Sequence, residues 1–186
     1  MELTYKFGVT PDDGRSYEYP NVFAVEKTAG PERLVIAPAG QHVSLMLALM
    51  RMMFEPFGIL YVLTVPRGGG EAGRYQVANP VAREEAEGFL GRFKEFFEND
   101  GRHHIWIASV GTSDSLVYDN HNVIYAYGEL REFERVLVKR GLTKVDCVEF
   151  PSPHTHKYNR AFDRSQQEVL GYWEWKQFPL QEDDDP

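Results

Sequence analysis

Short runs of alternating hydrophobic and polar residues open the chain and predict strands. These runs cover residues 3–9, 21–25 and 33–37, and turn-forming sequences such as TPDDG and TAGP separate them, which predicts an antiparallel meander. The next segment, 43–54, is apolar on nearly all sides and carries four of the five methionines. This pattern predicts a helix that is buried on most faces and ends before Pro56.

The clearest hydrophobic periodicity lies further along the chain. A β-branched run predicts a buried strand, and a glycine loop then leads to a helix with Asn79 as its N-cap and Pro80 at its first position. A second amphipathic helix is expected to end at Gly141. The predicted order is strand (59–65), helix (80–100), strand (103–110), one or two strand pieces (116–128), helix (129–140) and strand (144–150).

This order of elements is that of the ferredoxin-like βαββαβ core, in which helices cover one face of an antiparallel sheet. We therefore predict an α+β fold with that core over about residues 59–150. The N-terminal meander and the methionine-rich helix would extend the sheet or pack on it, and an aromatic segment would close the chain. We expect one domain over residues 1–180 and a disordered acidic tail over residues 181–186.

Composition excludes several classes of function. The formal net charge is −8, of which the acidic tail supplies four, and no stripe of lysine or arginine is present. Nucleic-acid binding is not expected, because it depends on neutralising phosphates. The most apolar run is too short to span a membrane and the first residues lack a secretory pattern, so we expect a cytoplasmic protein without membrane association. Cys147, the single cysteine, permits no internal disulfide and is expected to be a small buried thiol.

The glycine loop resembles a phosphate-binding sequence in its spacing. Gly68, Gly70 and Gly73 follow a predicted strand with the G-x-G-x-x-G spacing of dinucleotide-binding loops. However, the next helix begins several residues after the third glycine, and the acidic residue expected about 20 positions later would fall inside that helix. We therefore expect a flexible connection. The alternative is a phosphate-recognising module that uses the backbone amides of this loop together with Arg67 and Arg74.

Histidines beside two of the predicted strands suggest a metal site. His154 and His156 would point the same way from an extended stretch, a common arrangement for two metal-binding imidazoles. In a ferredoxin-like sheet, the end of the fourth strand lies at the same edge as the start of the third, which here carries Asp119 and His121. These side chains would suit zinc or another divalent ion, with Asp119 as ligand or catalytic base and Asp163 beside them.

Large aromatic residues gather near the end of the chain. Trp173 and Trp175 share one side of an extended segment, and Tyr172 lies on the other. Such residues fix a terminus either to its own domain or to a second copy of the chain. We expect packing on the same chain, and a homodimer interface is the alternative.

These observations support an ordered set of hypotheses on function. The first is an intracellular binding or regulatory module with an unknown protein or small-molecule partner. The second is a divalent-metal-dependent hydrolase built on the histidines and Asp119. The third is the phosphate-recognising module.

Overall fold

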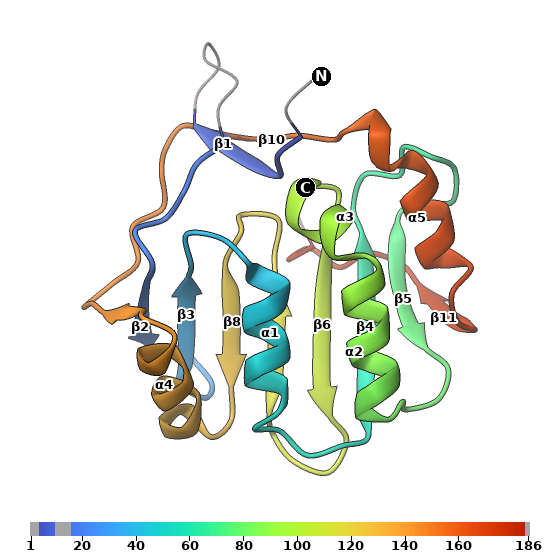
Figure 1. Cartoon of the computed structure of the whole chain (residues 1–186). Helices are drawn as coiled ribbons and strands as arrows, with labels where there is room; N and C mark the ends of the chain where they lie inside the picture. Colours follow the sequence, from blue (N-terminus) through green and yellow to red (C-terminus); the bar gives the residue numbers. More distant parts are fainter. Residues whose placement is uncertain (1–3, 10–15, 185–186) are drawn as a thin grey trace.

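The computed structural model describes residues 4–9 and 16–184, and its main feature is a large, mostly antiparallel sheet of nine strands (Figure 1). The strand order across this sheet is β11-β5-β4-β6-β7-β8-β3-β2-β9. The two remaining strands, β1 and β10, pair with each other and form a separate antiparallel ribbon. The fold is therefore mixed α+β, as the sequence predicted.

The strands are β1 (Phe7–Val9), β2 (Val22–Glu26), β3 (Arg33–Ala37), β4 (Phe57–Leu63), β5 (Gly73–Val77), β6 (His103–Ser109), β7 (Ser115–Tyr118), β8 (Ile124–Tyr127), β9 (Thr143–Lys144), β10 (His154–His156) and β11 (Trp175–Phe178). The helices are α1 (His42–Met50), α2 (Arg83–Arg92), α3 (Lys94–Asn99), α4 (Leu130–Lys139) and α5 (Asp163–Leu170), with a 3₁₀ turn at Arg160–Phe162.

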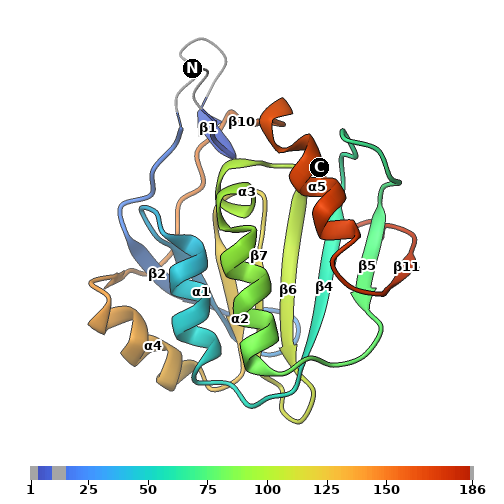
Figure 2. The ribbon, with the colours of Figure 1, turned by 45° about the vertical axis from the view of Figure 1, so that its right-hand side comes forward.

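The helices lie on one face of the sheet, and the main core lies between them and the strands (Figure 2). Burial alternates along β6, where Ile105 and Ile107 are fully buried and Trp106 between them is exposed. This period of two is expected when only one face of a strand is covered. Phe89 on α2 and Phe133 on α4 fill the core from the helical side.

The ferredoxin-like core is not confirmed, and the strand pairing shows why. That arrangement would place the segment 144–150 beside β4, whereas β4 pairs antiparallel with β5 on one edge and with β6 on the other. The sequence analysis missed β5, which begins at Gly73 and occupies the position expected for the last strand. Of the last expected strand, 144–150, only Lys144 belongs to a strand, as the second residue of β9, which pairs with β2. Cys147 is exposed rather than buried.

The predicted helices are present with corrected ends. The expected helix over residues 80–100 is divided into α2 and α3 at Phe93. Its N-cap is Ala82 rather than Asn79, because the Glu85 side chain accepts a hydrogen bond from the Ala82 N–H at 2.9 Å. Helix α4 has the predicted buried face, and Gly141 follows it with a φ of 84°.

The N-terminal meander is confirmed in part. β2 and β3 pair antiparallel as expected, whereas β1 pairs with β10 instead of joining them. Leu3, which began the first expected strand, and the turn over residues 10–14 lie outside the described residues. Among the described residues, no helix has the length and apolar character needed to cross a membrane.

Candidate metal centre

Three of the histidines named from the sequence converge. His121 lies in the loop between β7 and β8, and His154 and His156 lie on β10. One ring nitrogen from each of the three residues can be chosen so that all three atoms lie within 4.8 Å of one another. The ring centroids of His121 are 5.1 Å from His154 and 4.8 Å from His156, and those of His154 and His156 are 5.5 Å apart.

The β1–β10 ribbon explains how two of these side chains reach the third. Because successive side chains on a strand alternate, His154 and His156 project on the same side of β10. In the ribbon, His156 pairs with Phe7 and His154 pairs with Val9. The Phe7 ring is fully buried, and its centroid lies 5.3–5.6 Å from those of all three histidine rings. A buried aromatic residue therefore fixes the spacing of the cluster.

The Nδ1 atom of each histidine already has an oxygen partner. It lies 3.1 Å from the Asp119 carboxylate in His121, 3.1 Å from the Pro151 carbonyl in His154 and 3.1 Å from the Asn120 carbonyl in His156. An oxygen acceptor at Nδ1 favours the tautomer with the proton on that nitrogen, which leaves Nε2 as the metal-binding atom. Histidines that ligate metals usually have this outer hydrogen bond.

Asp119 lies behind His121 and is engaged by it. Its Oδ1 accepts hydrogen bonds from the backbone N–H groups of His121 and Val123, each at 3.0 Å, and its Oδ2 faces His121 Nδ1. Burial alone would raise the pKa of this carboxyl, but the contact with His121 brings it below its usual value. These contacts suit a carboxylate that orients the His121 ring. The expected role of Asp119 as a metal ligand or catalytic base stays a prediction.

Lys6 is a buried lysine behind the same loop, and no feature of the sequence singled it out. Its ammonium donates to the Phe97 carbonyl at 3.2 Å and lies 3.6 Å from the centroid of the Tyr118 ring. Burial lowers the pKa of Lys6 to about 7, against the attraction of Asp119 and other acids. Only the pairing of β1 with the distant β10 brings Lys6 here, so no local pattern could have identified it.

The three histidines differ in exposure in a way that leaves the cluster open to solvent. His154 is exposed, and His121 and His156 are half-buried. Burial, followed by the neighbouring His121 and His154, lowers the pKa of His156 to about 4. His156 is therefore a neutral imidazole near neutral pH, which is the form that binds metal ions.

Asp163, which was expected beside the histidines, lies elsewhere and pairs with Arg67 at 3.3 Å.

The glycine loop packs against α5. Gln166 donates to the Gly69 carbonyl at 2.5 Å, and Gln167 donates to the Gly68 carbonyl. A Cβ atom at Gly68 would collide with the backbone of Asp163, and one at Gly70 would press on Leu170. The glycines therefore permit close contact between the loop and a helix of the same chain.

Both arginines proposed for phosphate binding face carboxylates. Arg67 pairs with Asp163, and Arg74 lies 3.2 Å from Asp184. Asp184, in the acidic segment expected to be disordered, is buried by this contact, and Asp185 lies outside the described residues. Gly73 belongs to β5 opposite Leu63 rather than to a loop. Each of these two arginines is therefore already paired with a carboxylate. Phosphate recognition by the glycine loop stays an untested prediction.

The C-terminal aromatic residues pack on α2 of their own chain. The Phe89 ring centroid lies 5.2 Å from Tyr172, 4.5 Å from Trp173 and 6.1 Å from Trp175. The Trp175 indole also donates to the Val169 carbonyl at 3.1 Å. This packing agrees with the expected contact on the same chain, and the alternative, a homodimer interface, stays untested.

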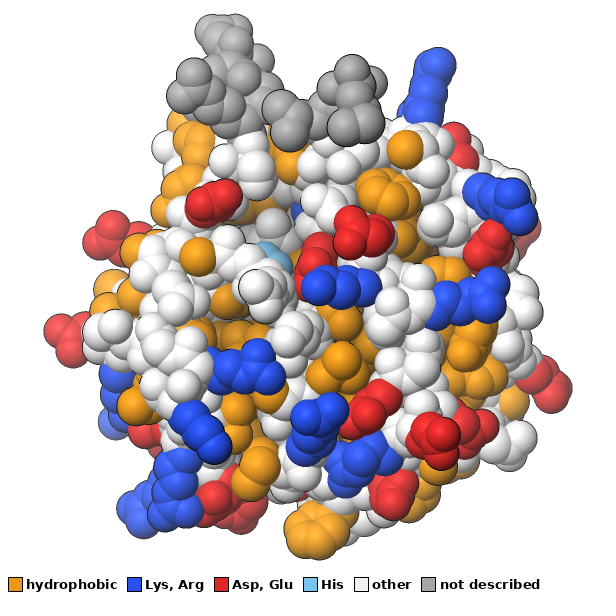
Figure 3. Space-filling view, viewed as in Figure 1, with side chains coloured by type: hydrophobic (Ala, Val, Ile, Leu, Met, Phe, Trp, Pro, Cys, Tyr) orange, Lys and Arg blue, Asp and Glu red, His pale blue; other side chains and the backbone are white. Residues whose placement is uncertain are grey.

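Basic and acidic side chains are mixed on the helix-bearing face, and several basic groups gather over its lower left and centre (Figure 3). Comparison of the sequence and the structure with family models, curated proteins and solved structures finds no match.

Proposed function

We propose that this protein binds a divalent transition-metal ion through the Nε2 atoms of His121, His154 and His156. The observation that carries the proposal is the set of three Nδ1 contacts, since they orient all three imidazoles with the same nitrogen free. A chance group of surface histidines has no reason to share this arrangement. The proposal is compatible with a binding or regulatory module and adds the ligand that such a module would hold.

Zinc is the first ion to test. Imidazole nitrogen suits zinc, copper, nickel and iron, and zinc accepts three histidines with a further ligand in a tetrahedral site. A Zn–N bond of about 2.1 Å would place two ligand nitrogens about 3.4 Å apart. One ring nitrogen from each histidine lies within 4.8 Å of the other two, so small rotations of the side chains would bring these atoms to the spacing that zinc requires.

Hydrolysis is the second candidate function, supported by the number of protein ligands. Three ligands leave a coordination position for water or substrate, which is typical of catalytic rather than structural zinc sites. The exposure of His154 gives solvent access to that position. A metal ion placed this way lowers the pKa of a bound water molecule and polarises a carbonyl or phosphoryl oxygen.

Elemental analysis of the purified, untagged protein is the direct test. We expect close to one equivalent of metal after incubation with zinc and gel filtration, and its loss in the double variant His154→Ala/His156→Ala. His104→Asn is the matched control, because it removes a histidine outside the cluster and should retain the metal. Absence of bound metal in the parent protein, or equal metal in the double variant, would exclude this site.

A hydrolase assay separates the two candidates. The zinc-loaded parent and the double variant are compared with activated ester and phosphoester substrates. Activity that depends on zinc and on both histidines supports the hydrolase, whereas stoichiometric zinc without activity on these substrates supports a metal-binding module.

A further inference from the structure

The outermost strand of the large sheet presents an open edge. β11 (Trp175–Phe178) ends the strand order and pairs with β5, and its other side has no strand partner in the described part of the chain. Both ribbon views place β11 at the rim of the sheet (Figures 1 and 2). An edge strand offers a row of main-chain N–H and C=O groups to which another extended chain can add.

The ladder with β5 determines which main-chain groups of β11 point outwards. The Ala78 N–H donates to the Glu174 carbonyl at 2.9 Å, one pair before β11 begins. In an antiparallel ladder, hydrogen-bonded and non-hydrogen-bonded pairs alternate. Lys176 therefore bonds to β5 as Glu174 does, whereas the N–H and C=O groups of Trp175 and Gln177 point away from β5 towards the open edge.

The side chains of this strand divide between the two faces of the sheet. Trp175 packs against the main core, and its indole donates to the Val169 carbonyl at 3.1 Å. Because side chains alternate along a strand, Glu174 and Lys176 lie on the opposite face, where both are exposed. The large aromatic ring is thus engaged within its own chain, and the open edge carries main-chain groups flanked by two opposite charges.

We propose that two copies of this chain join β11 to β11 in an antiparallel, two-fold pairing centred on Trp175. In this register, the main chain of Trp175 exchanges two hydrogen bonds with its counterpart in the second copy. Glu174 of each copy then lies opposite Lys176 of the other, in a non-hydrogen-bonded pair, where opposed side chains come closest. The two-fold axis produces this pair of opposite charges twice. The proposal does not depend on the metal centre.

The neighbouring registers are unfavourable. An axis at Glu174 places two carboxylates opposite each other, and an axis at Lys176 does the same with two ammonium groups, and like charges directly opposite destabilise a sheet. An axis at Gln177 sets Trp175 against Pro179, which has no N–H for the hydrogen bond that this pair requires. A two-fold interface needs a surface that is complementary to itself. The order of charges around Trp175 meets this need, which favours a second copy of the chain over an unrelated peptide.

Sedimentation of the full-length, metal-free protein over a series of concentrations tests the proposal. One pair of short strands is a small interface, so we expect a reversible dimer with a Kd between about 1 μM and 1 mM. Hydrogen exchange at the Trp175 amide should slow as the dimer forms, because this N–H then donates across the edge. A monomer at all concentrations up to about 1 mM, or a dimer without slower exchange at Trp175, would overturn the proposal.

Charge reversal tests the register. Lys176→Glu and Glu174→Lys each set like charges opposite one another and should weaken dimerisation by about tenfold or more, whereas the double variant Glu174→Lys/Lys176→Glu exchanges the two charges and should restore it. Lys27→Glu is the matched control, because it makes the same change at an exposed lysine that follows β2, near the other end of the strand order, and it should leave the dimer unchanged. A dimer that tolerates Lys176→Glu, or a double variant no better than the single ones, would indicate another surface or register and overturn the proposal.

Discussion

The Nδ1 atom of His121 lies 3.1 Å from the Oδ2 atom of Asp119, whose Oδ1 is held by two backbone N–H groups of the same loop. The loop thus fixes the carboxylate, and the carboxylate fixes the imidazole. Because a carboxylate can only accept, the proton of a neutral His121 belongs on Nδ1. This relationship leaves Nε2 of His121 as the nitrogen for the proposed metal and makes Asp119 a positioning residue.

Asp119→Asn should weaken metal binding while leaving the loop folded. The amide oxygen still accepts the backbone N–H groups, but the amide nitrogen would face His121 Nδ1 as a donor and favour the wrong tautomer. Losses of 10–100-fold in metal affinity are typical of such outer-sphere changes, and we expect about that range. Competition with a zinc chelator measures it. Unchanged affinity with an intact circular dichroism spectrum would show that Asp119 does not position the ligand.

Zinc should stabilise the folded protein, because the proposed ligands lie on two separate parts of the fold, the loop between β7 and β8 and the β1–β10 ribbon. An ion held by His121 and by the β1–β10 ribbon binds the folded chain better than the unfolded one. At a free zinc concentration 100 times Kd, the free energy of unfolding should rise by about 2.7 kcal/mol. Thermal unfolding with zinc and with a chelator measures the difference. The His154→Ala variant should show a much smaller rise, and an equal rise would mean that zinc binds elsewhere.

Arg102→Met should be strongly destabilising. The guanidinium is fully buried; it donates to Asp100 at 2.7 Å, to Asp163 at 3.0 Å and to the Asn159 carbonyl at 2.8 Å. Removing one partner of a buried ionic network leaves the other charges uncompensated, at a cost of about 3–5 kcal/mol.

Urea-induced unfolding measures this loss. Arg135→Met is the matched control, because Arg135 pairs with Glu132 on the exposed side of α4 and should change stability by about 0.5 kcal/mol or less. Similar effects of the two substitutions would contradict the importance of the buried network.

The free energy of unfolding should fall as the pH is lowered from about 6.5 towards 3. Burial lowers the pKa of His42 from its usual value of 6.5 to about 3. Above pH 6.5, His42 is neutral in both states and does not affect the balance. Between these values the unfolded chain binds a proton that the folded chain excludes, so each histidine of this kind removes up to about 1.4 kcal/mol per pH unit.

His42→Phe tests the assignment of this pH dependence. The variant should lose stability less steeply below pH 6.5 in chemical unfolding experiments. The slope will not vanish, since burial also lowers the pKa of His103 and brings that of His104 to about 4. An identical slope in parent and variant would contradict a neutral, buried His42.

The sequence alone determined the class of fold and most local elements. The hydrophobic pattern placed α4 and β3 nearly to the residue, because α4 buries one face against the main core and β3 is an apolar run that is buried on both faces. The sequence also identified the three histidines that converge, His121, His154 and His156. We expected them to meet at the edge of a ferredoxin-like sheet, whereas in the structure the β1–β10 ribbon brings His154 and His156 to His121.

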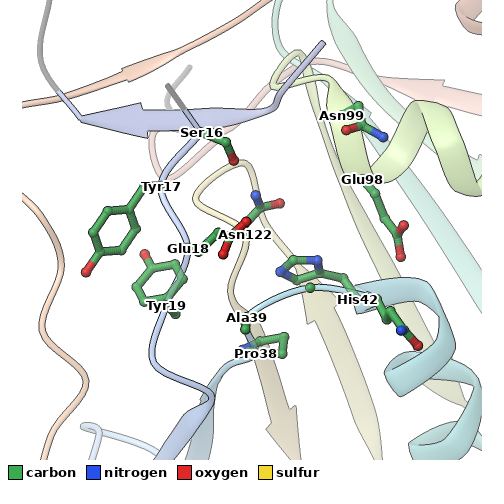
Figure 4. A pocket seen from close by; sticks show the side chains of 12 residues that line it. Ser16, Tyr17, Glu18, Tyr19, Pro38, Ala39, His42, Glu98, Asn99 and Asn122 are labelled. Atoms are coloured by element: carbon green, nitrogen blue, oxygen red, sulfur yellow. The ribbon is translucent and has the colours of Figure 1, made fainter. Parts of the chain in front are cut away.

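Only the tertiary structure decided how the elements pair and where the polar groups meet. β5 resembled a loop because glycines precede it, and its pairing with β4 displaced the expected last strand. The β1–β10 ribbon joins distant parts of the chain and carries Phe7 and Lys6 to the histidines. The pocket beside His42 is likewise lined by four separate segments of the chain (Figure 4). Hydrophobic periodicity reports which residues are buried, whereas the choice of partner depends on packing between residues far apart in sequence, which no local pattern encodes.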